Sequence, residues 1–191
     1  MILNIPNSLT LLRIALIPCL ILIFYLSENT LSAYQKNLTA TLIFLFAAIT
    51  DWLDGYLARR LNQTSDFGAF IDPVADKLIV IAALILLVKL GRVESIIAFI
   101  IIAREFTISS LREWMAMNGQ SGSIAVAFVG KLKTTMQMIA ILFLLYYENI
   151  LFLPTALMGK ILIYIAALLT IISMIYYLKI AFNMLKKKKG Y

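Results

Sequence analysis

Six apolar stretches divide this chain, and each is close to the length that crosses a lipid bilayer. They lie near residues 8–26, 38–58, 73–90, 95–115, 131–147 and 156–182, with short polar segments between them. A spanning helix needs about 20 mostly apolar residues. The mean hydropathy of +0.94 over 191 residues leaves no room for a separate soluble domain. The sequence therefore predicts an all-α integral membrane protein with six transmembrane helices, folded as a single transmembrane domain over residues 1–191.

Basic residues are distributed unevenly between the two sides of this predicted bundle. Six helices put both termini on one side, together with Arg59, Arg60, Lys77, Arg112, Lys131, Lys133 and the lysines at 186–189. The opposite side holds Lys36, Lys89, Arg92 and Lys160. Because Lys and Arg are enriched in cytoplasmic loops, we expect a multi-pass protein of the cytoplasmic membrane with both termini in the cytoplasm. The net charge of +7 flanks membrane segments, so its expected partners are membrane lipids and not nucleic acid.

Four aspartates interrupt the apolar pattern at helical spacing. Asp51 and Asp54 are three residues apart, and Asp72 and Asp76 are four apart, so on helices each pair shares one face. An Asp near the middle of a membrane helix costs roughly 2.5–3.5 kcal/mol on insertion scales, so such a cluster indicates a bound cation, an ion path or a catalytic site. Two such faces turned toward each other would make a pocket of oxygen ligands near the cytoplasmic surface.

The residue types around the aspartates indicate which ligands this pocket takes. Oxygen ligands suit Mg²⁺, Mn²⁺ or Ca²⁺, whereas zinc prefers Cys and His; the chain has no His and one Cys. Gly55 and Gly68 lack side chains, which would let a large polar substrate approach the backbone. Arg59 can reach a phosphate with its fork of donors. Together these residues predict a divalent-metal site that binds a diphosphate.

Purely structural interpretations of these motifs are also available. Asp54-Gly55 is a common turn signal, and Asp72-Pro73 would serve as a helix N-cap followed by proline in the first turn. Neither interpretation explains why the four carboxylates pair at helical spacing beside Arg59.

The spacing of eight residues in this region resembles the signature of a known enzyme family. The pattern is Asp51-x-x-Asp54-Gly55-x-x-Ala58-Arg59, then eight residues, then Gly68-x-x-x-Asp72-x-x-x-Asp76. It is similar to that of the CDP-alcohol phosphotransferases, integral membrane enzymes of phospholipid synthesis. The resemblance implies their helical fold, with the whole chain as one catalytic domain. It also implies a homodimer.

The resemblance assigns a role to each residue of the signature. It implies a site for two ions, Mg²⁺ or Mn²⁺. Asp51, Asp54 and Asp72 would bind metal, and Asp76 would contact the second ion. It also implies that Gly55, Ala58, Arg59 and Gly68 shape the site for the cytidine diphosphate of the donor. Because the chain lacks histidine, the general base must be a carboxylate, a lysine or a tyrosine. We predict that the general base is Asp76, the last aspartate of the cluster. The family resemblance implies the same residue.

Four basic residues outside the signature are candidates for an acceptor pocket: Arg104, Arg112, Lys131 and Lys133. Together they could bind an acceptor that carries its own phosphate. The alternative is that Arg112, Lys131 and Lys133 are cytoplasmic flanking charges; Arg104 fits this alternative poorly, because it lies deeper in its apolar stretch.

Further segments resemble the family members that use sn-glycerol 3-phosphate as acceptor. They are Asn4-Ile5-Pro6 with Leu9-Thr10 and Arg13, the stretch from Arg104-Glu105 to Trp114, and Gly130-Lys131-Leu132-Lys133-Thr134. This resemblance implies transfer of the phosphatidyl group of CDP-diacylglycerol to sn-glycerol 3-phosphate, with release of CMP.

Two alternative functions remain at this stage. One is a sister enzyme with another acceptor, such as a cardiolipin synthase that takes phosphatidylglycerol. The other is a small cation transporter whose aspartates line an ion path. A transporter of this kind should show an inverted repeat or paired broken helices, and the sequence shows neither.

Overall fold

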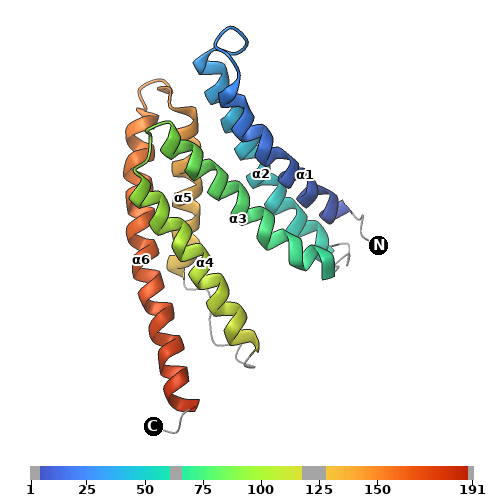
Figure 1. The fold of residues 1–191 in the computed structure, drawn as a ribbon, viewed down its shortest axis with the longest axis vertical. Coiled ribbons are helices and arrows are strands. Elements are labelled where there is room, and N and C mark those ends of the chain that lie inside the picture. Colours follow the sequence, from blue (N-terminus) through green and yellow to red (C-terminus); the bar gives the residue numbers. More distant parts are fainter. Residues whose placement is uncertain (1–4, 61–65, 118–127, 189–191) are drawn as a thin grey trace.

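The computed structural model describes residues 5–60, 66–117 and 128–188, and over that part the chain forms six α-helices and no β-strand (Figure 1). In chain order the helices are α1 (Ile5–Leu22), α2 (Ala33–Arg60), α3 (Asp66–Lys89), α4 (Ser95–Met117), α5 (Phe128–Tyr146) and α6 (Thr155–Lys188), with a short 3₁₀ helix, η1 (Ile23–Tyr25), after α1. The all-helical prediction is confirmed, and each expected stretch corresponds to one helix.

The largest difference from the predicted boundaries concerns the aspartate motifs. The third helix begins at Asp66 and not at residue 73, and Pro73 lies inside it. The N-cap interpretation of Asp72-Pro73 is therefore wrong. A proline inside a helix removes one backbone hydrogen bond, yet α3 continues through Pro73 to Lys89. The turn interpretation of Asp54-Gly55 is also wrong, because α2 continues through both residues to Arg60.

The helices form two neighbouring groups. Helix α1 packs against α2 and α3, while α6 packs against α4 and α5; contacts between α2 and α5 join the groups (Figure 1). The helices run up and down, so the end of α2, the start of α3 and the start of α1 lie at the same end of the molecule. Residues that are far apart in the sequence are thereby brought together at that end.

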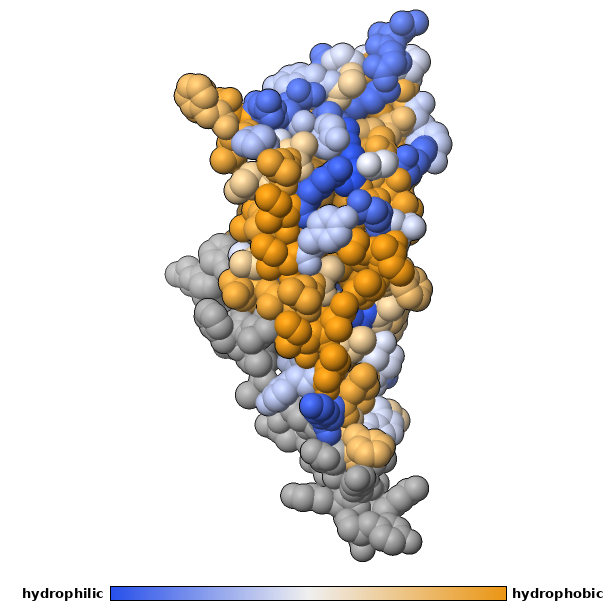
Figure 2. Space-filling model, turned by 90° about the vertical axis from the view of Figure 1, so that its left-hand side faces the viewer, coloured by the Kyte–Doolittle hydropathy of each residue, from blue (hydrophilic) through white to orange (hydrophobic). Residues whose placement is uncertain are grey.

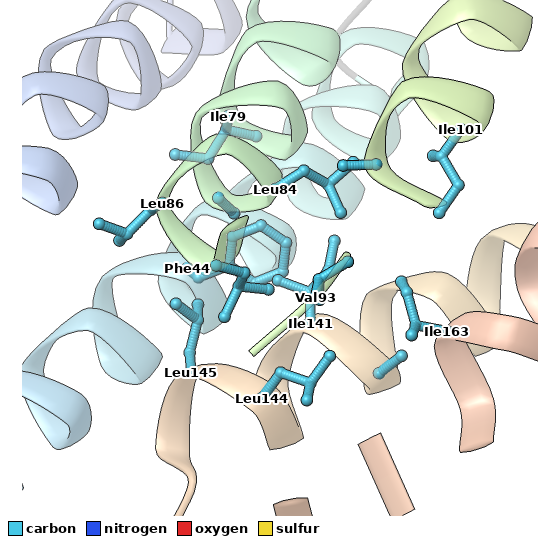
Figure 3. Packing of buried hydrophobic residues seen from close by; sticks show 14 of the residues in the cluster. Phe44, Ile79, Leu84, Leu86, Val93, Ile101, Ile141, Leu144, Leu145 and Ile163 are labelled. Carbon is cyan, nitrogen blue, oxygen red and sulfur yellow. The ribbon is translucent and has the colours of Figure 1, made fainter. Parts of the chain in front are cut away.

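Apolar side chains from all six described helices fill the centre between these groups (Figure 3). Phe44 of α2 and Leu84 of α3 are both buried there, together with Ile141 of α5. Helices α5 and α6 approach closely at Gly159, where an added Cβ would lie only 2.7 Å from Leu144 Cγ. Close approach of this kind at a small residue is typical of helices that associate within membranes.

The outer surface is apolar over its middle. Large apolar side chains such as Phe99 and Leu168 are exposed, and Figure 2 shows an apolar band across one face, with hydrophilic residues gathered at the upper end. Two helical segments in the described part, Asn7–Tyr25 and Thr155–Lys179, are long and apolar enough to cross a bilayer, and Leu132–Tyr146 is apolar but shorter. Such a surface is adapted to lipid and not to water.

Arg92 fastens the helices together at the end opposite the aspartates. Its Nη1 donates hydrogen bonds to the carbonyl oxygens of Leu144 (2.8 Å) and Leu145 (2.9 Å), and its Nη2 donates to Asn37 Oδ1 (2.7 Å). The two carbonyls belong to the last turn of α5 and have no partner within that helix. One guanidinium thus joins α2 to the C-terminal end of α5.

Candidate active site

The end of α2 and the beginning of α3 bring aspartates from both predicted pairs to one place. Asp51 lies near the end of α2, while Asp72 and Asp76 lie one turn apart on α3. Arg13 Nη1 is 3.3 Å from Asp51 Oδ1, and the same nitrogen donates a hydrogen bond to Asp76 Oδ1. Because one nitrogen reaches both carboxylates, Asp51 of α2 and Asp76 of α3 lie next to the same guanidinium of α1.

Helix α1 supplies two residues to this cluster that the sequence analysis did not assign to it. Besides Arg13, Thr10 donates from its Oγ1 to Asp72 Oδ1 at 2.6 Å. Thr10, Arg13 and also Asn7 are buried and spaced three residues apart, so they lie along one face of α1. Three buried polar residues at this spacing in an otherwise apolar segment were the signal that could have identified them.

Among the described residues of this cluster, acidic side chains outnumber basic ones. The Arg13 side chain is fully buried, whereas the side chains of Asp51 and Asp76 are 50% and 40% exposed. The cluster contains three carboxylates and one guanidinium. Carboxylate oxygens of this kind are suited to a hard divalent cation, so the donor chemistry fits the metal that the signature implies.

The described residues alone do not complete a metal site. Among them, no group of three or more acidic, His or Cys side chains is placed to hold a metal ion. The fourth predicted ligand, Asp54, lies on α2, but its side chain is outside the part that the structure describes. The same holds for the surroundings of Gly55, Ala58, Arg59, Arg112 and Lys131. Gly68 is described: it is buried on α3, on the face that carries Asp72 and Asp76.

A cavity of about 530 Å³ opens beside the aspartates, and residues of α1 to α5 line it. Its polar lining residues are Arg13, Asp51, Asp76, Lys77, Glu105, Thr134, Thr135 and Gln137. Between them the wall is apolar, with residues such as Ile79, Leu84 and Ile101. The volume lies in the range of small-molecule sites, and the mixed lining suits a ligand with both polar and apolar parts.

A second polar cluster lies on the α4 and α5 side of this cavity. Lys133 Nζ of α5 donates a hydrogen bond to Glu105 Oε1 of α4, and Arg104 Nη1 lies 3.2 Å from the same oxygen. Arg104 Nη2 reaches Ser173 Oγ of α6 at 3.3 Å. Glu105, which the sequence analysis did not assign, thus holds two of the four predicted acceptor residues beside each other.

Some polar atoms near this second cluster are buried without a hydrogen-bond partner in the described part of the chain. They are Arg104 Nε, Gln137 Oε1 and Thr170 Oγ1. Leaving a buried polar group unpaired costs about 1–3 kcal/mol. Of these three residues, only Gln137 also lines the cavity.

The fold and the site together define an all-helical protein with a lipid-adapted surface and an acidic centre that opens into a polar and apolar cavity. The chain belongs to the CDP-alcohol phosphatidyltransferase family, whose sequence profile matches residues 3–182. This membership confirms the family resemblance of the aspartate signature and sets aside the interpretation of the chain as a cation transporter.

Curated relatives share most of the chain. It is 50% identical over 181 residues to a protein of Haemophilus influenzae (93% of each chain), 48% identical over 180 residues to one of Escherichia coli (93% of this chain and 94% of the relative), and 44% identical over 183 residues to one of Wigglesworthia glossinidia brevipalpis (95% and 96%). Each relative is named CDP-diacylglycerol–glycerol-3-phosphate 3-phosphatidyltransferase.

Proposed function

We propose that this chain transfers the phosphatidyl group of CDP-diacylglycerol to sn-glycerol 3-phosphate, giving phosphatidylglycerophosphate and CMP. The observation that carries the proposal is the identity of 44–50% over 93–95% of the chain to relatives that bear this name. The cavity is compatible with it, since the donor joins a charged diphosphate to apolar acyl chains and the cavity wall is polar at the aspartates and apolar beyond them.

In this proposal Asp51, Asp54, Asp72 and Asp76 would hold two divalent ions, Mg²⁺ or Mn²⁺. When bound, such ions neutralise charge on the diphosphate and on the departing CMP oxygen. Gly55, Ala58, Arg59 and Gly68 shape the donor site. Thr10 fixes one Asp72 oxygen through its hydrogen bond of 2.6 Å, which limits the rotation of that carboxylate.

Asp76 is the proposed general base. Its side chain is 40% exposed and lines the cavity, so an acceptor hydroxyl can approach it. The hydroxyl oxygen of the acceptor bonds to the phosphorus of the phosphatidyl group, its proton passes to the Asp76 carboxylate, and the bond from that phosphorus to the CMP oxygen breaks. A base within hydrogen-bonding reach of the proton is the geometric requirement for this step.

The acceptor phosphate belongs, in the same proposal, on the α4 and α5 side of the cavity. Glu105 lines the cavity there and holds Lys133 and Arg104, which are buried next to it, and Arg112 and Lys131 would add two further charges. A phosphate offers several strong acceptors to such donors. An acceptor without a phosphate would not need them.

The acceptor is the part of the proposal that is easiest to test. Purified protein should release CMP from CDP-diacylglycerol in the presence of a divalent metal and sn-glycerol 3-phosphate, and release should fall to background when glycerol, serine or phosphatidylglycerol replaces that acceptor. Equal or faster CMP release with phosphatidylglycerol would instead identify a cardiolipin synthase. CMP release that is unchanged by EDTA would contradict the metal site.

We further propose that all six helices cross the cytoplasmic membrane, with the active site and both termini on the cytoplasmic side. Their lengths of 18–34 residues correspond to about 27 Å or more, comparable to the hydrocarbon core, and the basic residues favour this orientation. A reporter enzyme that folds only in the cytoplasm should be active when fused after Tyr191. Activity of a periplasm-specific reporter at that position would reverse the orientation.

A further inference from the structure

We propose that Arg13 is an internal counter-cation, which pairs with Asp51 and Asp76 in the metal-free protein and competes with the divalent metal for these carboxylates. The inference rests on the proposed function, in which both aspartates are metal ligands. It assigns to helix α1 a role in setting the metal affinity of a site that α2 and α3 provide.

The geometry places the positive charge of Arg13 between the two carboxylates. Its Nη1 is 3.3 Å from Asp51 Oδ1 and also donates to Asp76 Oδ1. The Arg13 side chain has no exposed surface, while both carboxylates are partly exposed and line the same cavity. The guanidinium is therefore held in the wall of the cavity, next to the two carboxylates that line it.

Electrostatics gives this arrangement two effects. Two carboxylates that share one site repel each other, and a neighbouring cation relieves the repulsion; Arg13 does this when no metal is bound. A divalent ion on the same two oxygens would lie next to the guanidinium and be repelled by its charge. Arg13 therefore stabilises the empty site and weakens metal binding to it.

Because the Arg13 side chain is buried, its contacts with Asp51 and Asp76 differ from an ion pair on the protein surface. An exposed pair contributes about 0–1 kcal/mol and is screened by salt, but a fully buried guanidinium cannot turn out to water when its partners are taken. Helix α1 packs against both α2 and α3, so the guanidinium stays near the aspartates whether or not metal is present. Its effect on the metal is therefore permanent.

Arg13→Gln provides the test, because it removes the charge and keeps polar atoms. The affinity for Mn²⁺ is measured on detergent-solubilised protein from the electron paramagnetic resonance signal of free Mn²⁺. One neighbouring charge changes the proton affinity of a carboxylate by about 10-fold to 1000-fold, and we expect Arg13→Gln to bind Mn²⁺ at least about 10-fold more tightly than the unmodified chain. In EDTA its melting temperature should be lower than that of the unmodified chain, and saturating Mn²⁺ should shrink this difference.

Arg92→Gln is the matched control. Arg92 is also an arginine that ties helices together, but at the opposite end of the molecule and through carbonyl and amide oxygens. Its replacement should lower the melting temperature equally with EDTA and with Mn²⁺ and leave the Mn²⁺ affinity unchanged. If Arg13→Gln does not fold, Arg13→Met, which also removes the charge and keeps an unbranched side chain, should still bind Mn²⁺ more tightly than the unmodified chain.

The outcomes separate this inference from the proposed function. Unchanged or weaker Mn²⁺ binding by the folded Arg13 variant would overturn the role of Arg13 and leave the metal site of the proposed function intact. Absence of Mn²⁺ binding by the unmodified chain would overturn both.

Discussion

Asp76→Asn should reduce the rate of CMP release at least about 100-fold, the typical effect of losing a general base, while binding of the nucleotide donor changes little. The amide has nearly the volume of the carboxylate but cannot accept the proton of the acceptor hydroxyl. The rate is measured as CMP released per minute at saturating substrates, and donor binding as the Kd of CDP in the presence of Mn²⁺.

Asp51→Asn is the comparison that isolates the base. Both carboxylates pair with the same Arg13 nitrogen, so both variants lose an ion pair to Arg13 and suffer similar structural effects. Asp51→Asn should lose the metal-dependent binding of CDP, whereas Asp76→Asn should keep most of it. Loss of a general base should leave far less than about a tenth of the turnover. If Asp76→Asn retains more than that, Asp76 is not the general base.

Lys133→Gln should lower kcat/KM for sn-glycerol 3-phosphate about 10-fold to 100-fold, because it removes a charge-assisted hydrogen bond of roughly 1.5–3 kcal/mol. The change should appear as a raised KM for the acceptor, with the KM for CDP-diacylglycerol nearly unchanged. The reason is that Lys133 of α5 is paired with Glu105 of α4, which lines the cavity, whereas the aspartates belong to α2 and α3.

Lys36→Gln is a matched control for this variant. Lys36 is also a buried lysine paired with a glutamate, with Nζ 2.7 Å from Glu28 Oε1, but it lies at the beginning of α2, at the other end of the molecule. Its replacement should leave both KM values unchanged. A donor KM that rises while the acceptor KM does not would move Lys133 to the donor site.

Removing Lys133 alone leaves Glu105 with one cation fewer, and breaking a buried ion pair costs about 3–5 kcal/mol when one partner is removed. The double variant Lys133→Gln with Glu105→Gln keeps the charge balance, so it should fold better and show the same increase in acceptor KM. If the single variant raises KM and the double variant restores it, the effect comes from the unpaired Glu105 and not from lost phosphate binding.

The sequence by itself determined the class of the protein, because the features that define it are local. Apolar stretches of about 20 residues require helices in a bilayer, and aspartates spaced three or four residues apart must share a face once the helix forms. Asp51 and Asp76 could therefore be assigned to one acidic site before any tertiary contact was known. The boundary of α3 was missed, because Asp72-Pro73 is a start signal when judged locally, whereas the helix begins at Asp66 and continues through both residues.

Only the tertiary structure decided what surrounds these aspartates. Arg13 is separated from Asp76 by 63 residues and Lys133 from Glu105 by 28, and no periodicity relates positions on different helices. The packing of α1 against α2 and α3 determines that a buried guanidinium faces two carboxylates, and the packing of both α4 and α5 against α3 and α6 determines that Glu105 meets Lys133. Ion pairs of this kind follow from the choice of neighbouring helices and their rotation, which depends on the whole apolar core and not on the spacing within any one segment.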